Sequence, residues 1–121
     1  MQELIITKIF SFGAAHNLDS YHGKCENLHG HNYRLEVSVK GVPDNEGMVI
    51  DYKVLKEIIN KTVIEKLDHK YLNEVLDFSP TSENLLIWMK EKLENKLNSE
   101  NYKLYKLVLW ETESNKASIY V

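Results

Sequence analysis

Cysteine, proline and long apolar segments are scarce in this chain of 121 residues. The single cysteine, Cys25, excludes an internal disulfide. Two prolines, and the lack of any repeat or Gly/Ser-rich tract, leave no linker at which a second domain would begin. No apolar run approaches the ~20 residues of a membrane-spanning helix, and the N-terminus has no signal-peptide pattern. We therefore expect one domain, residues 1–121, in a reducing cytoplasm, with no membrane contact.

An excess of basic charge is missing as well. The chain has 15 Lys and Arg residues against 18 Asp and Glu, a formal net charge of -3. This balance argues against a mainly electrostatic attraction to nucleic acid or to an anionic membrane. The length is sufficient for a hydrophobic core but not for a separate substrate domain. If a binding site needs a second wall, another subunit would have to supply it.

Histidines, by contrast, are concentrated in one part of the chain. His29 and His31 are one residue apart and precede the alternating segment 33–39. Residues i and i+2 of a strand project from the same face, so both imidazoles can reach one metal ion. His16 offers a third nitrogen, and three protein ligands with one open position is the arrangement of catalytic zinc. Iron, cobalt or nickel would also bind three imidazoles, so the pattern predicts the ligands better than the metal.

Cys25 lies close to these histidines and has two functional interpretations. As a fourth ligand it would close a Cys-His-His-His site and make the metal structural. As an unligated thiol near a cation and next to Lys24, its thiolate would be favoured and could act as a base. The spacing does not decide between them. His22, in the same segment, has no spacing that links it to the site, and we expect it at the surface.

The remaining pattern predicts an α+β fold in the order strand, strand, helix, helix, strand, strand. Asp51 is expected to cap the first helix, which ends near His69, and Thr81 or Ser82 the second. The result is a four-stranded antiparallel sheet with two helices on one face. Its open edges and its apolar outer face would both be removed if several subunits closed a barrel, so we expect an oligomer. The expected strands are residues 3–12, 33–40, 102–111 and 117–121.

Three further polar residues have an ordinary and a functional interpretation. Asp68 and His69 at a helix end are commonly a cap and a surface group, but a carboxylate can also orient a proton-transferring imidazole. Glu111 at a strand end is commonly solvated, but in a pocket it can accept two parallel hydrogen bonds from an amidine-like ring edge. Their spacing alone favours the ordinary interpretation.

Taken together and in order, six segments resemble the 6-pyruvoyltetrahydropterin synthase and 6-carboxytetrahydropterin synthase family. The most specific is the cysteine followed after three residues by His-Gly-His, and the resemblance spans nearly the whole chain. It implies the tunnelling fold, in which trimers close a barrel and two trimers form a hexamer. The segments are Ala14-Ala15-His16, Cys25-Glu26-Asn27-Leu28-His29-Gly30-His31, Gly47-Met48-Val49-Ile50-Asp51-Tyr52, Leu67-Asp68-His69, Pro80-Thr81-Ser82-Glu83-Asn84 and Glu111-Thr112.

The resemblance also implies a function for each part of the site. Zinc would bind His16, His29 and His31, and the substrate would be 7,8-dihydroneopterin triphosphate, whose side-chain hydroxyls reach the open zinc position. Cys25 would be the general base. Asp68 and His69 would form a proton relay that is contributed across a subunit interface. Glu111 would anchor the pterin, and Thr81 and Ser82 would line the pterin pocket.

Within the family, short chains resemble the 6-carboxytetrahydropterin synthases of queuosine and deazapurine biosynthesis, which release triphosphate and acetaldehyde. We predict this reaction, with Lys24 and His22 as candidates for the phosphate side. Glu26 directly follows Cys25, so the chain also matches members that use a glutamate to form 6-hydroxymethyl-7,8-dihydropterin for folate synthesis. That reaction, alone or as a second activity, is one alternative. A non-catalytic metal-binding protein with a closed Cys-His-His-His site is another.

Overall fold

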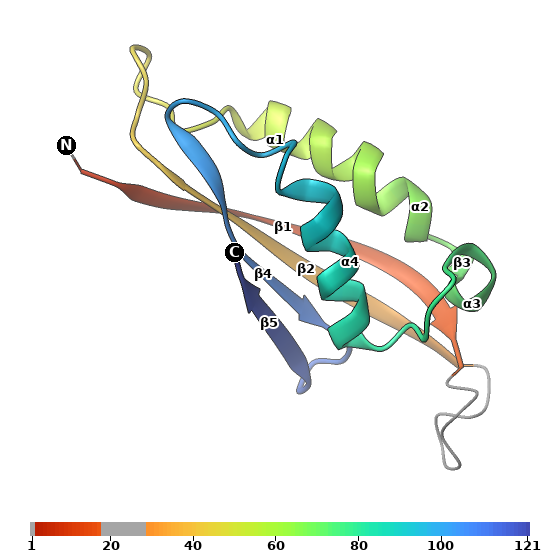
Figure 1. Cartoon of the computed structure of the whole chain (residues 1–121). Helices are drawn as coiled ribbons and strands as arrows, with labels where there is room; N and C mark the ends of the chain where they lie inside the picture. The colour runs from red at the N-terminus through yellow and green to blue at the C-terminus, as the bar shows by residue number, and fades with distance from the viewer. Residues whose placement is uncertain (1, 18–28) are drawn as a thin grey trace.

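One β-sheet, covered on a single face by helices, organises the chain in the computed structural model (Figure 1). The structure describes residues 2–17 and 29–121, together with the backbone but not the side chain of His29. Within that part the sheet has five strands in the order β3-β1-β2-β4-β5. Neighbouring strands are antiparallel except for the short β3, which is parallel to β1. The strands are β1 (Leu4–His16), β2 (His29–Gly41), β3 (Lys70–Tyr71), β4 (Tyr102–Trp110) and β5 (Lys116–Tyr120).

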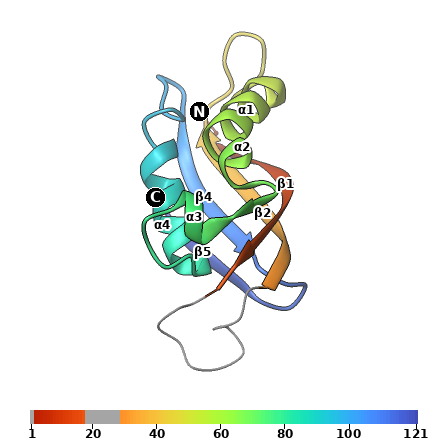
Figure 2. The same cartoon turned by 90° about the vertical axis from the view of Figure 1, so that its right-hand side faces the viewer.

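All the helices lie against the same face of the sheet, its inner face (Figure 2). Tyr33, Leu35, Val37 and Val39 alternate along β2 and are almost fully buried beneath them, as their period of two predicts. None of the helices in the described part of the chain is long and apolar enough to span a bilayer. The helical segments are α1 (Tyr52–Ile59), a π-helical segment η2 (Asn60–Ile64), α2 (Glu65–Leu67), α3 (Leu72–Val75) and α4 (Ser82–Leu93).

Both predicted helix starts are confirmed by their caps. The Asp51 carboxylate accepts from the backbone N–H of Lys53 at 2.8 Å, at the start of α1. At the start of α4 it is Thr81, rather than Ser82, whose hydroxyl accepts from the N–H of Asn84, at 3.1 Å. The Ser82 hydroxyl does not cap the helix and instead donates to the side chain of Glu111.

The π-helical segment between α1 and α2 explains how four apolar residues share one face. Leu55, Ile59, Val63 and Leu67 are all fully buried although they are spaced by four. In a regular helix of 3.6 residues per turn, each step of four would rotate the side chain by about 40°. A π-helical turn holds more residues and cancels part of that drift. Val54 lies beside this stripe and is 44% exposed.

The sheet differs from its predicted form at the end that carries the histidines. β1 and β2 extend to His16 and from His29, so these residues lie on strands and not in the predicted connection 13–32. Gly, Ala and Asn have weak strand propensity there, but cross-strand pairing of the two backbones overrides it. The fifth strand, β3, is too short to give a periodic pattern in the sequence. Within the residues that the structure describes, the predicted count of four strands is therefore corrected to five.

At the opposite end of the sheet, Gly41 is packed against a neighbouring backbone. A Cβ atom at this position would lie 2.1 Å from the carbonyl oxygen of Asn101. Asn101 in turn connects two chain segments, since its side-chain amide donates to the carbonyl oxygens of Val42 and Val49 at 2.9 and 3.0 Å. Only glycine allows this close approach.

Candidate active site

The paired ends of β1 and β2 bring histidines together. In the antiparallel register His16 is opposite His29, and Ala14 is opposite His31. The imidazole rings of His16 and His31 meet edge to face, with centroids 5.1 Å apart. His16 is only 2% exposed. Alternation places both side chains on the helix-covered face of the sheet.

A carboxylate at the end of a third strand lies close to the two imidazoles. Glu111 follows β4 directly, and its Oε1 lies 3.6 Å from Nε2 of His31. One ligand atom each from His16, His31 and Glu111 all lie within 4.8 Å of one another. Imidazole nitrogens and a carboxylate oxygen are donors that zinc and other divalent transition metals accept. These residues therefore fit a metal ion, and the prediction of a metal site gains a residue that the spacing of the histidines did not suggest.

The orientation of Glu111 is set by the start of α4. The Ser82 hydroxyl donates to Oε2 of Glu111 at 3.1 Å, and the backbone N–H of Glu111 donates to the carbonyl of Asn115 at 3.0 Å. A pocket of about 280 Å³ opens beside this pair and is also lined by Lys116. Ser82 and Glu111, which the family resemblance assigns to the same pterin pocket, thus lie together. Thr81, predicted with them, uses its hydroxyl in the helix cap.

His16 is held from its other side by two groups outside the predicted site. Its Nδ1 lies 3.0 Å from the backbone carbonyl oxygen of Pro80 and 3.3 Å from the hydroxyl of Tyr33. Tyr33 is buried and stacks on Phe12, with ring centroids 4.9 Å apart. Burial, and then the negative charge of Glu111, raise the pKa of Tyr33 above its usual value, so the hydroxyl keeps its proton at neutral pH. The signal that could have indicated Tyr33 is its position two residues after His31, which places both side chains on the same face of the strand.

Asp68 and His69 form a second group at the edge of β1. Oδ1 of Asp68 accepts from the backbone N–H of Gly13 and lies 3.0 Å from Nδ1 of His69. The N–H of His69 donates to the carbonyl of Gly13. Among the described residues His69 alone combines a side chain with a positive φ, of 60°. Non-glycine residues rarely adopt this conformation, and such strain is concentrated at functional sites.

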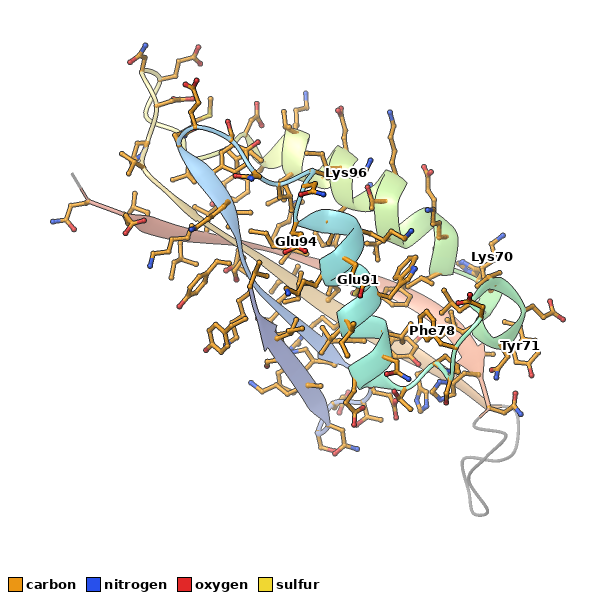
Figure 3. The ribbon with its side chains drawn as sticks, in the orientation of Figure 1. Lys70, Tyr71, Phe78, Glu91, Glu94 and Lys96 are labelled. Atoms are coloured by element: carbon orange, nitrogen blue, oxygen red, sulfur yellow. The ribbon has the colours of Figure 1, made fainter. Side chains whose placement is uncertain are left out.

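The two groups lie next to each other but differ in exposure. An open pocket of about 530 Å³ is lined by His31, His69 and Tyr71 among others. The His69 side chain is 88% exposed, whereas His16 is buried. Figure 3 shows Tyr71 and Lys70 at this end of the molecule, where β3 meets β1. The Tyr71 hydroxyl hydrogen-bonds the side chain of Asn17 and so fastens the end of β1.

Comparisons with known proteins agree with this geometry. The family model described as 6-pyruvoyl tetrahydropterin synthase matches residues 5–120. The chain belongs to this family. A 6-pyruvoyl tetrahydropterin synthase from Caenorhabditis elegans has the same fold, with a TM-score of 0.88 and 32% identity over 100% of this chain and 97% of that one. The predicted family and its α+β tunnelling fold are thereby confirmed.

Two relatives of this pterin synthase family member bear on its activity. A 6-carboxy-5,6,7,8-tetrahydropterin synthase from Synechocystis is 47% identical over 96 residues, which is 74% of each chain. A dihydroneopterin monophosphate aldolase from Pyrococcus furiosus is 40% identical over 101 residues, covering 84% of this chain and 83% of the relative. The prediction that the chain is an enzyme of the 6-carboxytetrahydropterin synthase type is confirmed.

Part of the predicted site lies outside the described residues. This applies to Cys25, Glu26, Lys24 and His22, and to the side chain of His29. Their predicted roles stay predictions.

Proposed function

We propose that this enzyme converts 7,8-dihydroneopterin triphosphate and one water molecule to 6-carboxy-5,6,7,8-tetrahydropterin, acetaldehyde and triphosphate. The observation that carries the proposal is the cluster of His16, His31 and Glu111 at one end of a pterin synthase fold. The name of the Synechocystis relative supports this reaction over others of the family. The corresponding pathway is queuosine or deazapurine synthesis in the cytoplasm.

The metal ligands in this proposal are His16, His29 and His31, and the metal is zinc. When bound, zinc supplies a Lewis acid that lowers the pKa of a substrate hydroxyl. The buried position of His16 keeps its ring in place and excludes water from that side of the site. Glu111 lies close enough to serve as a ligand, but its second oxygen is oriented by Ser82 toward the neighbouring pocket. We assign Glu111 to the amino and ring N–H groups of the pterin, to which a carboxylate offers two acceptors.

Proton transfer is assigned to Cys25 and to the Asp68 and His69 pair. Cys25 removes a proton from the substrate side chain as general base. Asp68, held by the backbone of Gly13, orients Nδ1 of His69 and stabilises the imidazolium that forms when the ring accepts a proton. The other ring nitrogen then exchanges protons with the substrate.

The exposure of His69 fits a site completed by a neighbouring subunit. The outer face of the sheet fits the same assembly, because Ile5, Ile9 and Tyr120 are all more than half exposed there. A free β5 edge and such a face are removed when sheets join into a barrel. We propose a homohexamer made of two trimers.

A second candidate activity is aldol cleavage to 6-hydroxymethyl-7,8-dihydropterin. It is favoured by the aldolase relative from Pyrococcus furiosus and by the position of Glu26 next to Cys25. In this mechanism the Glu26 carboxylate replaces the thiol as base. The candidate from another class, a non-catalytic protein with a closed Cys-His-His-His site, requires Cys25 to be a ligand.

Product analysis of zinc-loaded protein tests these candidates. Wild type, Cys25→Ala and Glu26→Ala are incubated with 7,8-dihydroneopterin triphosphate, with Glu91→Ala, an exposed carboxylate of α4, as the control. We expect 6-carboxytetrahydropterin and acetaldehyde from every variant except Cys25→Ala. Formation of 6-hydroxymethyl-7,8-dihydropterin that is lost only in Glu26→Ala would support the second candidate. Absence of turnover, with zinc lost on replacing Cys25, would support the third.

A further inference from the structure

The hydrogen-bond partners of His16 decide which of its nitrogens carries the hydrogen. The Pro80 carbonyl oxygen, 3.0 Å from Nδ1, has lone pairs and no hydrogen. It can only accept, so Nδ1 must be the N–H nitrogen of the neutral imidazole. The lone pair of the ring is then on Nε2. A hydrogen bond at one ring nitrogen commonly selects the nitrogen that binds a metal in this way.

Tyr33 supports the same arrangement from a second side. Its hydroxyl oxygen lies 3.3 Å from Nδ1, where it acts as a second acceptor for the shared N–H. The phenol ring contacts His16 edge to face, with centroids 6.4 Å apart, and His31 in the same manner at 5.7 Å. With Phe12 stacked on its other surface, the ring of Tyr33 has little freedom to move. The packing of this ring therefore fixes the position of the Tyr33 hydroxyl next to Nδ1 of His16.

The Pro80 carbonyl is equally well fixed. Pro80 is buried and immediately precedes Thr81, whose side chain caps α4. Ser82, the next residue, holds Glu111. The start of α4 thus supports two members of the cluster, one through a backbone carbonyl and one through a hydroxyl.

We propose that the Tyr33 hydroxyl and the Pro80 carbonyl are positioning groups that hold His16 in its Nδ1–H form, with Nε2 presented to the metal. Neither group reacts with substrate; both act through His16. The inference rests on the metal site of the proposed function. Such partners of a ligand histidine typically change metal affinity by about 10- to 100-fold.

Nuclear magnetic resonance of the metal-free protein tests the protonation directly. Long-range correlations between ring hydrogens and nitrogens in ¹⁵N-histidine-labelled wild type distinguish an N–H nitrogen from one with a lone pair. His16→Asn identifies the His16 signals by their loss. We expect hydrogen on Nδ1. Hydrogen on Nε2 would overturn the proposal, and this result does not depend on whether the protein binds a metal.

Metal affinity provides the second test. Tyr33→Phe removes the hydroxyl and keeps the stacked ring, while Tyr105→Phe makes the same change at a tyrosine that packs on Tyr120, away from the histidines. In chelator competition we expect Tyr33→Phe to bind Zn²⁺ about 10-fold more weakly than wild type, and Tyr105→Phe to bind it with wild-type affinity. The Co²⁺ absorption spectrum should change only in Tyr33→Phe. Equal affinities of both variants, with equal melting temperatures of the metal-free proteins, would reduce Tyr33 to a packing residue. A wild type that binds no metal would instead contradict the proposed function.

Discussion

Glu111 is the residue whose role is most sharply tested by one substitution, Glu111→Gln. The structure places Oε1 3.6 Å from Nε2 of His31 and gives Oε2 a hydrogen bond from Ser82. As the pterin anchor, the carboxylate would accept two charge-assisted hydrogen bonds from the ring edge. The amide keeps one oxygen and places an NH₂ group where the other acceptor was, so one of these bonds is lost.

The size of the effect follows from that lost bond. A hydrogen bond to a charged group contributes about 1.5–3 kcal/mol, which corresponds to roughly 10- to 150-fold in substrate affinity. We therefore expect the KM of Glu111→Gln to rise by that factor. Zinc affinity should change by less than about 3-fold, because the carboxylate only neighbours the ligands in this assignment.

Steady-state kinetics and chelator competition on the same preparations separate the two roles. Glu113→Gln, an exposed carboxylate in the turn between β4 and β5, is the matched control and should leave both quantities unchanged. A loss of zinc affinity of about 10-fold or more in Glu111→Gln would show that Glu111 is a ligand, and our assignment to the pterin would be wrong.

The remaining predictions concern stability and metal dependence. Gly41→Ala should lower the free energy of unfolding by about 2–4 kcal/mol in urea titrations, because its Cβ would overlap the Asn101 carbonyl. At Gly47 a Cβ would meet no atom, but φ is 83°. Gly47→Ala should therefore lower the free energy of unfolding by only about 1 kcal/mol. Equal effects would contradict the overlap. His69→Gly should abolish turnover yet raise stability by up to about 1 kcal/mol, because glycine tolerates the positive φ; a destabilised variant would disprove the strain. Thr81→Ala removes the cap of α4 and should lower the free energy of unfolding by about 1 kcal/mol in the same titration. Chelation of the metal should lower the melting temperature of wild type, and an unchanged value would contradict ligand binding to the folded state.

Local patterns in the sequence predicted those features that depend on neighbouring residues. The alternation from Tyr33 to Val39 indicated which face of β2 is buried. Asp51, and the choice between Thr81 and Ser82, indicated where two helices begin. These predictions succeeded because a strand period or a helix cap involves residues only two to four positions apart. The spacing of His29 and His31 predicts a shared face for the same reason, and this stays a prediction because the side chain of His29 lies outside the described residues.

The remaining features of the site depend on contacts between residues far apart in the chain. Pro80 reaches His16 across 64 positions, and Glu111 reaches His31 across the β2–β4 pairing. The periodicity of the sequence does not predict such contacts, because they depend on strand register and on how α4 packs over the sheet. The sequence by itself determined the kinds of donors present and the faces on which they lie. Only the tertiary structure decided which of them meet, because cross-strand pairing and helix packing set the distances between side chains and, at His16, the nitrogen that carries the hydrogen.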